Sequence, residues 1–101
     1  MAVLYITEFK WMGQAPNSVP SMALQAPLAE QTVAIGGGSV ASSAFNAGTR
    51  FVRLHTDAIC SIEFGAAPTA TATTARMAAN QTEYYSVPEG GAFKVAVITN
   101  T

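Results

Sequence analysis

Alternation of apolar and polar side chains with a period of two is the clearest pattern in this chain, and it is strongest in residues 49–65. The apolar positions there are Val52 and Leu54, followed by Ala58, Cys60, Ile62 and Phe64. Such alternation predicts two strands that each bury one face. The phase changes at Thr56-Asp57, so we expect a tight turn at that point.

Other segments have the β-branched and aromatic content of strands. They are residues 2–9, 31–45, 81–87 and 92–100. We expect residues 31–45 to form two strands joined by a glycine hairpin turn, and residues 2–9 to lie at a sheet edge. No segment has a 3.6-residue apolar stripe of helical length. The pattern therefore predicts an all-β chain, folded as a single antiparallel β-sandwich over residues 1–101.

Two long segments interrupt the strands. Residues 10–31 contain Pro16, Pro20 and Pro27, and each proline disfavours helix in the residue before it. We expect an extended proline-rich N-terminal arm there, with a short strand near residues 21–24.

The second segment, residues 66–79, is composed mainly of alanine and threonine, and Arg76 is its only charged residue. The sequence predicts a long loop without secondary structure. Loops of that length are usually functional or disordered. Two interpretations remain open, a mobile surface loop and an arm that rests on a neighbouring subunit, where small side chains allow close backbone approach.

Composition narrows the classes of partner. The 101 residues are 50% hydrophobic and 11% charged, with a net charge of −1. The five basic residues are scattered, which argues against nucleic acid and against charge-driven membrane association. The start of the chain lacks the basic region of a signal peptide, and no apolar run approaches a membrane span. Cys60 is the only cysteine, which excludes an internal disulfide and fits a cytosolic product.

The sequence shows no catalytic constellation. His55, Asp57 and Glu63 provide three groups that can bind a cation, but a solvated strand face explains them better. No G-x-S-x-G elbow is present, and Cys60 lies in phase with apolar neighbours, as a core residue does. We therefore expect no enzyme activity, no metal and no cofactor.

Residues suited to a protein interface occur in both long segments. Trp11 has two open interpretations: a lone tryptophan often packs in a core, and a tryptophan in an extended arm is also a typical interface anchor. The candidate interface residues are Trp11, Met12, Pro16 and Pro20 in the arm, and Ala70, Thr71, Ala72 and Arg76 in the loop.

The second half of the chain carries a resemblance. Its pattern is a strand that ends in Phe64-Gly65, the Ala/Thr loop, the Glu83–Tyr85 strand, and Gly91 followed by Val95–Ile98. This pattern resembles small virion proteins of tailed bacteriophages, and among these the capsid decoration (cement) proteins. The resemblance implies a jelly-roll β-sandwich made in the bacterial cytoplasm, without catalytic residues. It also implies a protein that self-associates as a dimer or trimer and binds the major capsid protein on the virion surface.

Two alternatives stay open. One is another virion component, such as a head fibre base, a tail protein or a head–tail joining protein. The other is a carbohydrate-binding β-sandwich, which needs a platform of polar and aromatic side chains. The only adjacent aromatic candidates, Tyr84 and Tyr85, point to opposite faces of their strand.

Overall fold

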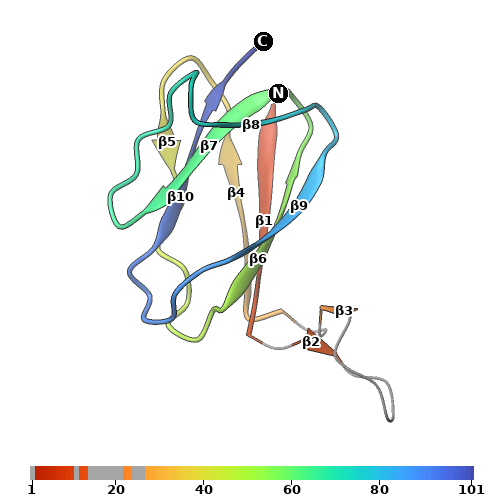
Figure 1. Ribbon diagram of the computed structural model, residues 1–101, viewed down its shortest axis with the longest axis vertical. Helices are drawn as coiled ribbons and strands as arrows, with labels where there is room; N and C mark the ends of the chain where they lie inside the picture. The colour runs from red at the N-terminus through yellow and green to blue at the C-terminus, as the bar shows by residue number, and fades with distance from the viewer. Residues whose placement is uncertain (1, 11, 14–21, 24–26) are drawn as a thin grey trace.

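A computed structural model describes residues 2–10, 12–13, 22–23 and 27–101 (Figure 1). This part of the chain contains strands and no helix, and hence no helix able to cross a membrane. The strands are β1 (Val3–Phe9), β2 (Met12–Gly13), β3 (Met22–Ala23), β4 (Ala29–Ala34), β5 (Val40–Ala41), β6 (Phe51–Thr56), β7 (Cys60–Gly65), β8 (Ala75–Met77), β9 (Thr82–Ser86) and β10 (Lys94–Thr99).

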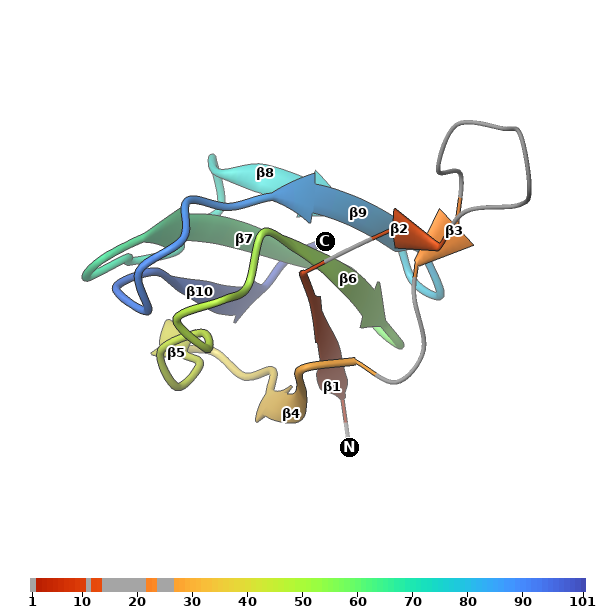
Figure 2. The same ribbon diagram turned by 90° about the horizontal axis from the view of Figure 1, so that it is seen from below.

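Eight of these strands form two antiparallel sheets. The first sheet has the order β4-β1-β6-β9 and the second has the order β5-β10-β7-β8. Figure 2 shows the two sheets as neighbouring layers, with β9 beside β8 at one end and β4 near β5 at the other. The prediction of an all-β antiparallel fold is confirmed.

The core lies between the two layers. Its buried apolar side chains come from both sheets and include Leu4, Ile6, Val33, Val52, Leu54, Cys60, Ile62, Met77, Val95 and Val97. The arrangement is therefore sandwich-like, with one apolar face of each sheet turned inward. Burial of Val52, Leu54, Cys60 and Ile62 confirms the strand phase expected from the alternation, while Phe64 packs against the core from a partly buried position.

The position of the first strand differs from the prediction. β1 is an inner strand: Leu4 pairs with Val33 of β4 on one side and with Thr56 of β6 on the other. The alternation identified the strand but contains no information on its neighbours, because these are distant in the sequence. Removing β1 would therefore divide the first sheet and not merely trim an edge.

The expected glycine hairpin is also wrong. β4 belongs to the first sheet, whereas β5 pairs with β10 in the second, with Ala41 opposite Ala96 and Val40 opposite Val97. The exposed residues 36–38 therefore carry the chain from one sheet to the other. A glycine-rich sequence suits a hairpin turn within one sheet and a crossing between two sheets equally well. The local pattern therefore does not distinguish these two connections.

The Ala/Thr segment has more structure than expected. Residues 75–77 form β8, which pairs with β7, and Met77 is fully buried in the core. Part of the predicted loop is thus an edge strand of the second sheet. Small residues here belong to a packed segment, which the composition alone did not reveal.

Most of the predicted arm lies outside the described residues, including Trp11, Pro16 and Pro20. Its described parts include β2 and β3, which pair antiparallel with Met12 opposite Ala23. β3 falls within the segment, residues 21–24, where a short strand is expected. The last residues assigned to the arm belong to β4.

Candidate functional site

The outer face of the first sheet gathers polar and aromatic side chains from four strands. Two cross-strand rows define it, because residues opposite one another in paired strands point to the same face. The rows are Thr32-Tyr5-His55-Thr82 and Glu30-Thr7-Arg53-Tyr84. This surface is named the open face below.

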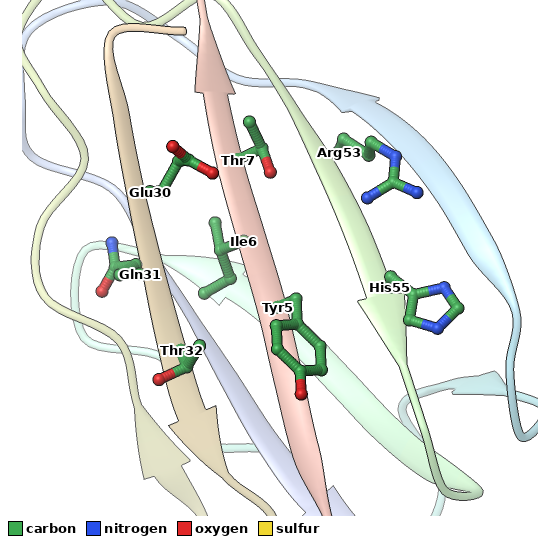
Figure 3. A pocket seen from close by; sticks show the side chains of 8 residues that line it. All are labelled: Tyr5, Ile6, Thr7, Glu30, Gln31, Thr32, Arg53 and His55. Atoms are coloured by element: carbon green, nitrogen blue, oxygen red, sulfur yellow. The ribbon is translucent and has the colours of Figure 1, made fainter.

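An open hollow of about 620 Å³ lies on this face. Its lining comprises Tyr5, Ile6, Thr7, Glu30, Gln31, Thr32, Arg53 and His55. Figure 3 shows Tyr5 on the middle strand, with the β4 residues on one side and Arg53 and His55 of β6 on the other. The volume falls within the range of about 300–1,000 Å³ typical of small-molecule sites.

Two lining side chains are held by their neighbours. His55 Nδ1 lies 2.8 Å from the hydroxyl oxygen of Thr82 on β9. The rings of Tyr5 and His55 lie 6.3 Å apart between centroids, at an angle of 46°. Such contacts restrict the ring orientations, yet Tyr5 remains 45% exposed. An aromatic surface is therefore presented to solvent in a defined position.

The two charged lining residues have no such contacts. Within the described part of the chain, the side chains of Arg53 and Glu30 form no hydrogen bond or ion pair with another residue. Arg53 offers up to five N–H donors, and the carboxylate of Glu30 offers only acceptors. Both kinds of hydrogen-bonding group thus line one hollow and remain available to a ligand.

Further aromatic residues flank the hollow. Phe51 stacks on Phe9 at 5.1 Å and lies 6.5 Å from Tyr84. Tyr84 is 55% exposed and stands opposite Arg53, but it does not line the hollow. The open face therefore has one exposed tyrosine in the hollow and a second beside it.

The predicted interface residues of the Ala/Thr segment do not share one environment. Ala70 is only 2% exposed, and its backbone N–H donates to the Ser39 hydroxyl at 2.9 Å. The expectation that its side chain lies on the surface is wrong, because the segment folds back on its own chain. Thr71, Ala72 and Arg76 are exposed.

Hydrogen bonds fix this segment against the second sheet. The Asn100 side-chain amide donates to Ser61 Oγ at 2.6 Å and to the carbonyl of Ala72 at 3.1 Å. A local turn adds a backbone bond of 3.1 Å from Thr74 to Thr71. Arg76 Nε donates to an oxygen of Thr101 at 3.4 Å.

The arm's candidate residues cannot be placed with these. Trp11, Pro16 and Pro20 lie outside the described residues, and Met12 begins β2. The structure therefore brings together only the loop half of the predicted interface, in the exposed Thr71, Ala72 and Arg76 near the second sheet.

The residues considered for a cation are dispersed. His55 lies on the open face, Glu63 is exposed on β7 of the other sheet, and Asp57 Oδ1 accepts a 2.7 Å bond from the Val3 N–H. No group of three or more His, Cys, Asp or Glu side chains suited to a metal ion occurs among the residues that the structure describes.

Cys60 is fully buried, and burial raises the pKa of its thiol above the ordinary value, with a smaller opposing contribution from the Thr56 hydroxyl. Its sulfur lies 3.6 Å from Thr56 Oγ1. A raised pKa lowers the thiolate fraction at neutral pH, and the thiolate is the nucleophile. These properties are those of a core thiol.

Glu8 is a buried carboxylate that sequence reasoning missed. It is 2% exposed, and Oε1 accepts bonds from the Asn46 N–H at 2.7 Å and the Thr49 hydroxyl at 2.8 Å. Oε2 accepts a 3.2 Å bond from Gln31. The carboxylate thus ties β1 to β4 and to the loop before β6, which is a structural role.

The open face was missed as well. Tyr5, Glu30 and Arg53 come from strands far apart in the sequence, and only the register of β4, β1 and β6 unites them. The available signal was the alternation of polar positions in each strand. Without the strand order, that signal does not combine into a site.

Comparison of the chain with protein-family models, with curated proteins and with solved structures gave no significant match.

Proposed function

We propose that this protein is a non-enzymatic virion component, a capsid decoration protein of a tailed bacteriophage with a jelly-roll fold. The observation that carries the proposal is the order in which the chain visits the two sheets. From β4 to β10 it changes sheet at every connection except the one between β7 and β8.

That order supports assignment to the jelly-roll class of sandwiches, which have eight strands and are common in viral capsid and lectin domains. β1 pairs with β4 and β6 and completes the first sheet. The fold does not by itself define a function. It agrees with the resemblance of the second half of the chain to phage virion proteins.

The surface chemistry supports a protein partner. Charged residues make up only 11% of the chain. A low-charge surface is buried against a neighbour without leaving charges desolvated and unpaired. The exposed Thr71 and Ala72 offer small side chains of this kind. The proposed partners are the major capsid protein and further copies of this chain, as a dimer or trimer.

Cosedimentation tests the proposal. The purified full chain is added to capsids that lack it, taken from the virion whose genome encodes it. A decoration protein binds in many copies across the shell, and binding weakens when Ala72→Glu places a charge in the contact. Glu89→Gln serves as the control, because it changes an exposed charge in the loop before β10, distant in the sequence from this segment.

Copy number separates this role from that of another virion component. A head–tail joining protein or a fibre base binds at few positions on the particle. Saturation at a few copies per particle would overturn the decoration role in favour of a joining or fibre role. Absence of any binding to capsids would overturn both.

A further inference from the structure

We propose that the hollow on the open face is a binding site for a neutral saccharide, with one sugar ring stacked on Tyr5. This inference goes beyond the capsid role and does not rest on it, because it follows from the first sheet alone. The hollow lies among Tyr5, Arg53, His55 and Glu30 (Figure 3).

The first step is that these side chains lie outside the hydrophobic core. The core is formed from the opposite side of the same strands, where Leu4, Val52 and Leu54 are fully buried. Tyr5 keeps 45% of its surface exposed although it lies in an inner strand. Solvation of the strand face alone does not require a large aromatic residue there.

The second step is the pairing of an aromatic surface with unsatisfied polar groups. A sugar ring has an apolar face made of C–H groups and a rim of hydroxyls, and each hydroxyl both donates and accepts hydrogen bonds. The Tyr5 ring provides a surface for the apolar face. Glu30 accepts from hydroxyls, Arg53 donates to them, and the hydroxyl of Thr7 does both. Ligand sites typically combine apolar surface with a few such polar groups.

The third step concerns charge. One guanidinium and one carboxylate line the hollow, on β6 and β4 respectively, with β1 between them. A phosphorylated or carboxylated ligand binds best where several cationic side chains cluster. Here the carboxylate of Glu30 would repel such a ligand. The balance of charges therefore favours a neutral sugar over an acidic one.

The chain provides its own matched control. Tyr84 has the same side chain on the same sheet face and is slightly more exposed, but it does not line the hollow. A non-specific affinity of exposed aromatic rings for sugars would involve both tyrosines. A site at the hollow depends on Tyr5 and not on Tyr84.

The experiment is an NMR titration of the purified full chain with four neutral probes and one acidic probe. The neutral probes are the methyl glycosides of glucose, galactose, mannose and N-acetylglucosamine. The acidic probe is N-acetylneuraminic acid. We expect at least one neutral glycoside to saturate with a dissociation constant on the order of 1 mM, the scale for a small ligand at a shallow site. Amide shifts should centre on residues 5–7 and 53–55.

The variants define the site. Tyr5→Ala should weaken binding at least tenfold, and Glu30→Gln or Arg53→Gln at least threefold, while Tyr84→Ala should change it less than twofold. Thermal unfolding of each variant confirms that it is folded. Should Tyr5→Ala fail to fold, the Glu30→Gln and Arg53→Gln variants decide the question.

The inference is overturned if none of the neutral glycosides saturates the protein at concentrations up to 50-fold above the expected dissociation constant. It is also overturned if Tyr5→Ala and Tyr84→Ala lose the same saccharide affinity. Binding of the acidic probe alone would overturn it as well. None of these would affect the capsid proposal, because the titration contains no capsid.

Discussion

The outer faces of the two sheets differ although the sheets have the same number of strands. On the first sheet, Tyr5 and Tyr84 stand about half exposed. On the second sheet, Ser61 and Ala96 alternate away from the core and are nevertheless fully buried. One outer face is thus available to partners, and the other is partly covered by the protein's own chain.

Side-chain size accounts for this difference. Small residues on the second sheet let another segment approach the backbone closely. Asn100 bridges Ser61 and the carbonyl of Ala72, so the Ala/Thr segment lies against this face. The first sheet carries Tyr5, Arg53 and His55 at outward positions, and Tyr5 keeps 45% of its surface exposed.

The largest expected effect comes from charging the covered segment. Ala70→Glu places a carboxylate at a position that is 2% exposed and should lower the free energy of unfolding by about 2–4 kcal/mol. Ala72→Glu, two residues further at an exposed position, should change it by less than about 0.5 kcal/mol. Urea denaturation followed by fluorescence or circular dichroism measures both.

Equal stability of these two variants would contradict the packing of the Ala/Thr segment against the second sheet. The pair also sharpens the capsid test, because Ala72→Glu should lose binding without losing the fold. Ala70→Glu should lose both capsid binding and stability. Its loss of binding therefore gives no information about an interface.

The sequence predicted the strands better than their arrangement. Alternation of Val52 with Arg53 and of Leu54 with His55 is a local property, and it identified β6 and its buried face correctly. Placing β1 inside the first sheet requires pairing with β4 and β6, and no local pattern records these contacts. For the same reason, the glycine-rich residues 36–38 were predicted as a hairpin turn, whereas they cross from one sheet to the other.

The candidate site was even less accessible to sequence reasoning. A hollow depends on which side chains stand opposite one another, and that depends on register across four strands. Alternation places Tyr84 and Tyr85 on opposite faces of their strand, so the two rings do not form one platform. The structure agrees: Tyr84 is exposed on the open face and Tyr85 packs against the core. Tyr5 shares the open face with Tyr84 because β6 pairs with both β1 and β9.

A second, smaller loss of stability is expected from the buried carboxylate behind the open face. Glu8→Ala leaves the Asn46 N–H and the Thr49 hydroxyl without their acceptor and should cost about 1–3 kcal/mol. Glu30→Ala removes a carboxylate from the open face and should cost less than about 0.5 kcal/mol. Thermal or urea unfolding of both variants compares the two faces of the same sheet.

An equal effect of the two glutamate substitutions would contradict the assigned burial of Glu8. Glu8→Gln refines the result, because its amide oxygen still accepts a hydrogen bond. We expect its stability to fall between those of the wild type and Glu8→Ala.

The next expected effect is a pH dependence that originates between the sheets. Burial, with a further contribution from Glu83, raises the pKa of Tyr85 above its ordinary value of 10.0. The folded state therefore retains the proton at pH values where the unfolded state releases it. This contribution to stability is complete below about pH 10 and is lost as the pH rises through the folded-state pKa.

Tyr85→Phe removes this ionisation and should flatten the alkaline decline of stability above pH 10 relative to the wild type. Around pH 7, the difference in the free energy of unfolding between Tyr85→Phe and the wild type should not change with pH. Urea denaturation at pH values from 7 to 11 measures this. The same steep decline in both proteins would show that Tyr85 does not titrate as a buried group.

The smallest expected effects are those of the two exposed tyrosines. Each contributes one cross-strand aromatic contact, Tyr5 with His55 and Tyr84 with Phe51. Such pairs are worth about 0.2–1 kcal/mol, so Tyr5→Ala and Tyr84→Ala should each lower the free energy of unfolding by less than about 1 kcal/mol. Urea denaturation of both variants measures the effect, and a loss above 2 kcal/mol in either would mean that its ring supports the fold. If both losses of stability are small, neither ring is required for folding. A larger loss of saccharide affinity in Tyr5→Ala than in Tyr84→Ala then measures the contribution of the hollow to binding.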